Sequence, residues 1–400
     1  MQHTPTSDRV HIAIFGRCNS GKSSLINALT GQEVAIVSDI AGTTTDLVSK
    51  PIELPNIGAT ILIDTPGLDD NTALGEQRTS LTLKAIDKTD IAVVLFSLED
   101  TSVEEQLISQ LKAREIPVVG ILSKSDEVQS NSNLSSKVAD ILNSQPIALS
   151  SLTREGINQL LTRLATFAHQ EPRLITEGLC ECGDTVVLVM PQDAQAPKGR
   201  LIKPQVEVLR ELLDRGCNAF CCTPDNLKSA LNNLATPPQL IITDSQVFAS
   251  INTVVEEYRK QKVGNLPLLT SFSILFAQHK GDITTFIEGA KKLQSLSPSS
   301  RILIAEACSH IPQNEDIGRV KLPRMLRNRI GETLHIDIVG GNDFPTDLSR
   351  YDLVIHCGAC MFNRRHVMSR VAQAQAQNIP MTNYGIAIAS LSGIIDKVAY

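Results

Sequence analysis

Residues 10–31 read VHIAIFGRCNSGKSSLINALTG, and this stretch decides the fold of the first part of the chain. Within it, residues 16–23 (GRCNSGKS) fit the phosphate-binding pattern G-x-x-x-x-G-K-[ST]. A strand-like apolar run precedes the pattern and a helix-like run follows it. The glycines let backbone N–H groups surround phosphate oxygens, and the N-terminus of the following helix adds a favourable dipole. The sequence therefore predicts a P-loop nucleotide-binding domain.

The side chains of this loop have separate expected roles. Lys22 is expected to neutralise the β- and γ-phosphate oxygens, and Ser23 to bind Mg²⁺. A second stretch, residues 41–46 (AGTTTD), is expected to act as a mobile switch whose threonines, Thr43 and above all Thr44, reach the same ion. The other residues of the loop region expected to contact the nucleotide are Gly16, Asn19, Ser20, Gly21 and Ser24.

Two further motifs end predicted strands at the spacing of a GTPase. Residues 64–67 (DTPG) place Asp64 where it reaches Mg²⁺ through water, and the Gly67 amide where it senses the γ-phosphate. Residues 123–126 (SKSD) place Asp126 where it accepts hydrogen bonds from guanine N1 and N2, which adenine cannot supply. Lys124, Ser150 and Ser151 complete the expected base-binding loops.

Two details narrow the class of GTPase. Leu68 follows the DTPG motif, so the glutamine that commonly orients the attacking water is absent there. Asn19, together with the 41–46 switch, resembles the potassium-dependent GTPases of the TrmE/Era type, in which this Asn helps to hold K⁺ beside the phosphates. We therefore expect slow, K⁺-stimulated GTP hydrolysis with Lys22, Asn19 and Thr44 as the catalytic residues. Ser123 replaces the commoner Asn of N-K-x-D, which is expected to loosen nucleotide binding.

Apolar runs alternate with helix-period stretches along almost the whole chain, which predicts an α/β fold. We expect a P-loop GTPase domain with a mostly parallel sheet over residues 1–171, followed by two smaller α/β domains over 172–265 and 266–400. The third domain is expected to open with two helices and to be helical after a strand at 351–356.

Composition restricts the partners. The 400 residues are 20% charged with a net charge of −6, and 4% aromatic with no Trp. Such a chain has no general attraction for nucleic acid or anionic membranes, and few side chains that stack on bases. No run of 18 apolar residues and no signal peptide pattern are visible, so we expect a cytoplasmic protein without a nucleic-acid or membrane partner.

The C-terminal third carries a cysteine and histidine pattern. Cys308 and His310 follow the apolar run RILIA, and residues 356–360 (HCGAC) follow YDLVI. If both runs are parallel strands, their cysteines gather at the carboxyl edge of one sheet. Three cysteines suit a 4Fe-4S cluster with one non-thiolate ligand. A zinc site completed by a histidine, or buried cysteines without a metal, are the alternatives. Five others are expected to be small core residues: Cys180, Cys182, Cys217, Cys221 and Cys222.

A TrmE/Era-type GTPase followed by C-x-H and H-C-x-x-C resembles the HydF family, the GTPases of FeFe-hydrogenase maturation. The resemblance implies a homodimer with a middle dimerisation domain and a C-terminal iron–sulfur domain. It implies that Cys308, Cys357 and Cys360 hold a 4Fe-4S cluster, with Glu315 as the fourth ligand or, less favourably, His310 or His356. It also implies a scaffold that receives a diiron precursor, assembled with radical-SAM maturases, and passes it to apo FeFe-hydrogenase.

Two other functions are compatible with parts of the sequence. One is an RNA-modification or ribosome-assembly GTPase with a C-terminal zinc site, against which the acidic charge and scarce aromatics argue. The other is a signalling GTPase whose C-terminal region binds proteins. The colour and metal content of the anaerobically purified protein would separate them.

Overall fold

The computed structural model describes residues 4–31, 48–69, 75–126, 132–168, 173–192, 201–262, 266–307, 316–341 and 343–400. These residues form two compact units, residues 1–172 and 173–400. The first unit ends one residue beyond the expected 171/172 boundary. Thr43, Thr44, Cys308, His310 and Glu315 lie outside the described residues.

The first unit is built around a six-stranded sheet of order β2-β3-β1-β4-β5-β6. β2 is antiparallel to β3, and the other neighbours are parallel. The mostly parallel sheet confirms the predicted fold class. Its strands are β1 (Val10–Gly16), β2 (Val48–Leu54), β3 (Gly58–Asp64), β4 (Ile91–Phe96), β5 (Val118–Ser123) and β6 (Ile147–Leu149). Its helices are α1 (Lys22–Thr30), α2 (Gly75–Ile86), α3 (Ser102–Ala113), α4 (Ser132–Leu142) and α5 (Ile157–Ala168).

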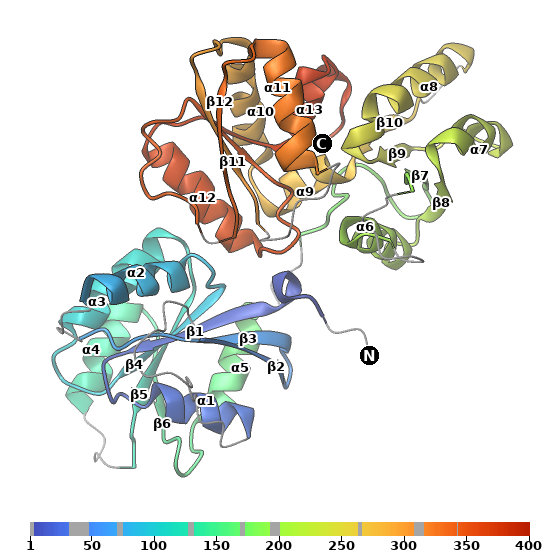
Figure 1. Ribbon diagram of the computed structural model, residues 1–400. Helices are drawn as coiled ribbons and strands as arrows, with labels where there is room; N and C mark the ends of the chain where they lie inside the picture. Colours follow the sequence, from blue (N-terminus) through green and yellow to red (C-terminus); the bar gives the residue numbers. More distant parts are fainter. Residues whose placement is uncertain are drawn as a thin grey trace. The chain divides into compact units, whose positions relative to one another are not determined.

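The residues of β1 explain why helices cover both faces of this sheet. Successive side chains of a strand point to opposite faces. Ile12 and Ile14 pack in one core with residues of α1 and α5, whereas Ala13 and Phe15 pack in a second core with residues of α2, α3 and α4. The two helical layers are visible in Figure 1. A strand that is apolar on both faces is typical of a buried parallel sheet, and it delivers its last residue, Gly16, directly to the loop.

The second unit contains two parallel four-stranded sheets, of order β10-β9-β7-β8 and β12-β11-β13-β14. The first is formed by β7 (Thr185–Val189), β8 (Asn218–Cys222), β9 (Leu240–Thr243) and β10 (Leu268–Ser271). The second is formed by β11 (Arg301–Ala305), β12 (His335–Val339), β13 (Leu353–His356) and β14 (Met381–Asn383). The helices are α6 (Lys203–Asp214), α7 (Leu227–Asn233), α8 (Phe248–Gln261), α9 (Phe272–Lys280), α10 (Ile283–Lys291), α11 (Leu322–Ile330), α12 (Arg364–Ala376) and α13 (Tyr384–Leu391).

One apolar cluster joins the two sheets of the second unit. It includes Val187 and Ile241 of the first sheet and Ile302 and Val354 of the second, each of them fully buried. Burial of apolar surface at about 25 cal/mol per Å² makes such a shared core the main reason that the two sheets stay together. Among the described residues, no helix has the length and apolarity needed to cross a bilayer.

Two short strands were not expected. β10 pairs with β9, so the middle sheet continues past the expected 265/266 boundary, and the third domain does not open with a helix. β14 pairs with β13 within a stretch expected to be entirely helical. Both strands have only three or four residues and lead directly into a helix. An apolar run of that length does not distinguish a strand from the first turn of a helix.

Candidate functional site

The P-loop depends on glycines at both of its ends. A Cβ added to Gly16 would lie 2.6 Å from the Ser20 Oγ and 3.1 Å from the Leu95 Cβ, so no side chain fits there. Gly21 precedes α1 in a left-handed conformation, with φ of 95°, which L-residues other than glycine rarely adopt. The loop therefore turns tightly, and Lys22 becomes the first residue of α1.

The ammonium of Lys22 folds back over this loop. Its Nζ donates to the carbonyl oxygens of Gly16 at 3.0 Å and Arg17 at 2.8 Å. Burial lowers the pKa of Lys22, while attraction to Asp64 opposes that change. The charge is thus held over the loop, as the sequence predicts for a group that meets phosphate oxygens.

Two buried oxygen atoms near the loop have no hydrogen-bond partner among the described residues. They are Oδ1 of Asp64, at the end of β3, and Oγ of Ser20. Burial raises the pKa of Asp64, and attraction to Lys22 opposes the rise. Buried polar atoms without partners cost free energy, so this pair of oxygens fits a site completed by a hydrated Mg²⁺ and a nucleotide.

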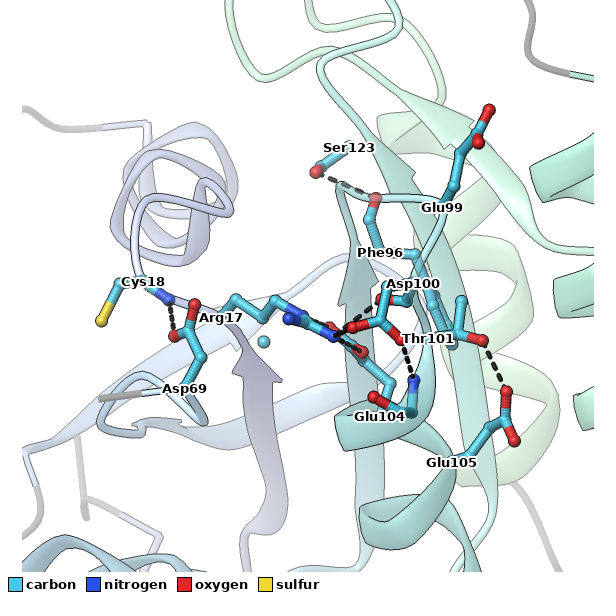
Figure 2. Close-up of polar contacts among 12 residues, drawn as sticks. Arg17, Cys18, Asp69, Phe96, Glu99, Asp100, Thr101, Glu104, Glu105 and Ser123 are labelled. Carbon is cyan, nitrogen blue, oxygen red and sulfur yellow. Dashed lines mark hydrogen bonds and ion pairs between the residues drawn. The ribbon is translucent and has the colours of Figure 1, made fainter. Parts of the chain in front are cut away.

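The segment after β3 lies against the P-loop. The Thr65 hydroxyl donates to the Ile14 carbonyl at 2.7 Å, and the Cys18 amide donates to Oδ1 of Asp69 at 2.7 Å. Figure 2 shows the Asp69 carboxylate turned toward the Cys18 main chain. A Cβ on Gly67 would lie 2.3 Å from the Cys18 Sγ, so the approach requires glycine. No sequence motif marks Asp69, because its contact with the Cys18 amide becomes apparent only in the folded chain.

A buried ion pair supports the loop from the other side. The guanidinium of Arg17 donates from Nε to the Glu104 Oε1 at 2.9 Å, and from Nη2 to the Asp100 carbonyl at 2.7 Å and Oδ2 at 3.2 Å (Figure 2). Arg17 is 8% exposed and Glu104 is 1% exposed. Hydrogen bonding to Glu104 is the main cause that raises the pKa of Arg17. No local sequence pattern indicates this pair, because its members are 87 positions apart.

The two predicted base-binding loops meet beside β5 and β6. The Ser150 side chain hydrogen-bonds to Asp126 and lowers the pKa of this exposed carboxyl group. The Ser125 amide donates to the Leu149 carbonyl at 3.3 Å, which joins the loops through the main chain. The Ser123 hydroxyl, at the end of β5, donates to the Phe96 carbonyl at the end of β4 at 3.2 Å (Figure 2).

The predicted cysteine loop begins directly after β13. The parallel register pairs Ala305 with His356, so the carboxyl ends of β11 and β13 lie side by side. The Cys357 Sγ accepts N–H groups from Ala307 at 3.0 Å and Ala359 at 3.4 Å. Backbone N–H donors favour the thiolate form, which is the form that binds metals.

His356 is already engaged by protein groups. Its Nε2 accepts from Arg370 at 2.9 Å, and its Nδ1 lies 2.8 Å from the Cys357 carbonyl. Burial and the charge of Arg370 lower the pKa of His356 to about 3. Both ring nitrogens thus have partners, which argues against His356 as the fourth metal ligand.

No group of three or more His, Cys, Asp or Glu side chains in the described part of the chain is arranged to hold a metal. Cys308 and Glu315 are outside that part, so only Cys357 and Cys360 of the expected ligands are described. Of the cysteines expected in the core, Cys180 and Cys217 are buried with their Sγ atoms 4.0 Å apart. The expectation is wrong for Cys182 and Cys221, which are exposed.

Curated relatives match the first part of the chain. The tRNA modification GTPase MnmE of Psychrobacter sp. is 36% identical over 174 residues, which cover 39% of this chain and 36% of the relative. The GTPase Der of Akkermansia muciniphila is 32% identical over 185 residues, which cover 45% and 38%. This chain thus spans little more than a third of their length. A crystal structure of Era with MgGDPNP and 16S ribosomal RNA nucleotides is 18% identical with a TM-score of 0.35, covering 54% of this chain and 93% of that chain.

Three family models match consecutive parts of the chain. Residues 11–124 match the 50S ribosome-binding GTPase model, so the first unit is a GTPase domain. Residues 175–281 match the hydrogen maturase F dimerization domain, and residues 284–399 match the hydrogen maturase F tetramerization domain. The last two matches follow each other almost without a gap and together span more than half of the chain. The chain therefore belongs to the hydrogen maturase F family.

Proposed function

We propose that this chain hydrolyses GTP and acts as a scaffold that carries the diiron precursor of FeFe-hydrogenase on a C-terminal 4Fe-4S cluster. One observation supports the proposal most strongly. The Cys357 Sγ accepts the amide of Ala307, the residue directly before Cys308, within the region that matches the tetramerization model. Two of the three proposed cluster ligands thus belong to segments that meet at one sheet edge.

The nucleotide half of the proposal rests on the first unit. Lys22 neutralises the phosphate oxygens, and its ammonium is already held over the loop by two carbonyls. Asp64 and Ser23 hold Mg²⁺, which supplies charge stabilisation when it is bound. Asp126, with Ser150 beside it, selects guanine. We include Thr43 and Thr44 as ligands from the switch, and Ser24, Lys124 and Ser151 as further nucleotide contacts.

The route to hydrolysis does not use a glutamine, because Leu68 occupies that position. We propose that Asn19, at the exposed turn of the loop with φ of 59°, helps to hold K⁺ beside the phosphates. The cation there stabilises the charge that develops on the transferred phosphoryl group. Turnover is then slow and depends on the monovalent cation.

The cluster half of the proposal assigns Cys308, Cys357 and Cys360 as ligands. Glu315 is the proposed fourth ligand and His310 the alternative, while the engaged ring of His356 argues against that residue. A 4Fe-4S cluster with one weak, exchangeable ligand supplies an iron to which a cyanide-bearing precursor binds. The donors from Ala307 and Ala359 hold the Cys357 thiolate in position for that cluster.

The partners follow from the family. We propose that the chain forms a homodimer that can assemble further into a tetramer, as the names of the two C-terminal family models indicate. The proposed partners of the assembly are the radical-SAM maturases and apo FeFe-hydrogenase.

Anaerobic purification tests the two halves together. The proposal expects a brown protein with about four irons per chain, an EPR signal after reduction, and GTP hydrolysis that is faster in KCl than in NaCl. A colourless protein that contains zinc and binds RNA would replace this proposal with an RNA-modification or ribosome-assembly GTPase. Activity measured on apo-hydrogenase with and without the reconstituted protein tests the carrier role.

A further inference from the structure

Two lysines from the region that matches the dimerization model reach the cysteine loop. The Lys280 Nζ, at the end of α9, donates to the carbonyls of Phe362 at 3.0 Å and Ala359 at 3.4 Å. The Lys203 Nζ, at the start of α6, donates to the Cys360 carbonyl at 3.0 Å. The loop that carries the proposed cluster ligands is therefore anchored from outside the C-terminal sheet.

Lys280 is an unusual residue to find at this depth. It is 4% exposed, and its Nζ lies 5.6 Å from the centre of the Phe276 ring. Lysine is almost never fully buried unless its charge is stabilised. Carbonyl oxygens and an aromatic face are groups that stabilise an ammonium. Lys280 is thus surrounded by groups that stabilise an ammonium, and two of its hydrogen bonds go to the cysteine loop.

A second set of hydrogen bonds runs in the opposite direction, from α12 to the end of α9. Arg364, the first residue of α12, donates from Nη1 to the carbonyls of Gly281 at 2.6 Å and His279 at 3.2 Å. Lys280 of α9 thus holds the loop before α12, and Arg364 of α12 holds the end of α9. These reciprocal bonds fix the loop to the end of α9, within the dimerization match.

The bond to Ala359 links the lysine directly to a cysteine. Ala359 has φ of 53°, a left-handed conformation that is unfavourable for alanine. In this conformation its N–H donates to the Cys357 Sγ while its carbonyl accepts from Lys280. Holding the carbonyl thus helps to keep the adjoining peptide group directed at the thiolate.

We propose that Lys280 and Lys203 are positioning residues for the 357–360 loop, which they hold in its metal-binding shape while their charges favour the reduced cluster. The contribution of Lys203 is the smaller one, because the Glu207 carboxylate lies 3.1 Å from its Nζ. This inference rests on the cluster of the proposed function. Hydrogen bonds to the sulfurs and local charge set the potential of an iron–sulfur cluster. A nearby positive charge stabilises the more negative, reduced state, so removing it makes the potential more negative.

The test compares Lys280→Met and Lys203→Met with the control Lys228→Met in the full chain. Lys228 is an exposed lysine of α7 that faces Glu257 at 3.9 Å and does not belong to the loop contacts described here. Hydrogen–deuterium exchange of the metal-free protein follows the amides of residues 357–363. EPR-monitored redox titration follows the reconstituted cluster.

We expect amide exchange in the loop to be about tenfold faster in Lys280→Met, because a hydrogen bond from a charged donor is lost. The midpoint potential is expected to become more negative, with smaller changes of the same sign in Lys203→Met and none in Lys228→Met. Exchange and potential equal to those of the unmodified protein would overturn the proposal. If Lys280→Met does not fold, Lys203→Met decides by the same readouts.

The two arms separate this inference from the proposed function. If the unmodified protein takes up no iron–sulfur cluster, the cluster assignment fails, and the exchange measured without metal still decides whether the lysines hold the loop. If the cluster forms and both readouts are unchanged in the lysine variants, the lysine inference alone fails.

Discussion

Arg17 and Glu104 form a buried ion pair that connects the P-loop to α3, with 2.9 Å between Nε and Oε1. The carbonyl of the same arginine accepts the Nζ–H of Lys22 at 2.8 Å. The side chain of Arg17 therefore holds the main chain at the position that orients the phosphate-binding lysine. Removing one partner of a buried pair costs about 3–5 kcal/mol where no other charge compensates the remaining partner. The Asp100 carboxylate, 3.2 Å from the guanidinium of Arg17, offsets part of that cost when Glu104 is changed.

The first prediction concerns Glu104→Gln. The change keeps the shape of the side chain and removes its charge, so the anchor of the P-loop is weakened while the bonds from Arg17 to Asp100 remain. We expect GDP affinity to fall by about tenfold, which corresponds to about 1.4 kcal/mol. Fluorescent-nucleotide titration measures it. Glu105→Gln is the matched control, because Glu105 lies on the same helix as Glu104, accepts from the N-cap residue Thr101 and does not contact Arg17 (Figure 2). Equal losses in both variants would contradict the role of the pair.

The second prediction concerns Asp64 and pH. Burial raises the folded-state pKa of Asp64 above its unfolded value. A raised pKa contributes stability that is fully present below the unfolded pKa and is lost as pH rises through the folded pKa. An asparagine at this position does not ionise, so the variant does not lose this stability as pH rises. The nucleotide-free Asp64→Asn protein is therefore expected to melt a few degrees higher at neutral pH. Scanning calorimetry of the transition that responds to GDP measures the shift.

The melting temperature of Asp64→Asn should not exceed that of the unmodified protein once Mg²⁺ and nucleotide are present, because the ion neutralises the carboxylate in the unmodified protein. Asp87→Asn is the control, since Asp87 is another half-buried carboxylate and its Oδ1 faces the Arg114 guanidinium at 4.0 Å. A melting temperature of Asp64→Asn at or below that of the unmodified apo-protein would contradict an unfavourable burial of the ionised Asp64 carboxylate.

The third prediction concerns base selection. Asp126→Asn replaces an acceptor by a group that also donates, which conflicts with the two donors of guanine. GTP affinity is expected to fall by about 100-fold or more, and affinity for xanthosine triphosphate to rise. Competition binding with both nucleotides measures this exchange. Asp140→Asn, on the exposed face of α4, should change neither affinity. If Asp126→Asn still prefers GTP to xanthosine triphosphate, Asp126 does not contact the base.

The fourth prediction concerns the cation. If Asn19 helps to hold K⁺, the initial rate of GTP hydrolysis should be higher in KCl than in NaCl at equal ionic strength. Asn19→Ala should lower the rate in KCl to the NaCl level and leave the NaCl rate nearly unchanged. Asn158→Ala, an exposed change on α5, is the control. If the unmodified protein hydrolyses GTP at the same rate in both salts, the proposed potassium site is wrong.

The sequence predicted what local patterns encode. The P-loop, the DTPG and SKSD segments and the strands before them depend on neighbouring residues, and the family models and the mostly parallel sheet agree with them. The strands β10 and β14 were missed, since three or four residues carry no measurable periodicity. They exist because neighbouring strands supply their hydrogen bonds.

The support of both sites was also invisible in the sequence. Arg17 bonds to Glu104, which is 87 positions away in the sequence, and Lys280 bonds to Phe362, which is 82 positions away. Such pairs depend on which elements the tertiary fold brings together. Motif spacing therefore predicts which groups are expected to meet the ligand, whereas the residues that hold those groups became apparent only in the folded chain.

The last prediction concerns the metal itself. Cys357→Ala and Cys360→Ala each remove a proposed thiolate ligand, so reconstituted protein should lose most of its iron and its EPR signal. GTP hydrolysis should persist, because the P-loop belongs to a separate compact unit. Cys221→Ala is the matched control, since this exposed thiol lies on β8. Full iron content in the Cys357 variant would exclude that residue as a ligand. Loss of zinc in place of iron would identify the site as a zinc centre, because the same thiolates bind either metal.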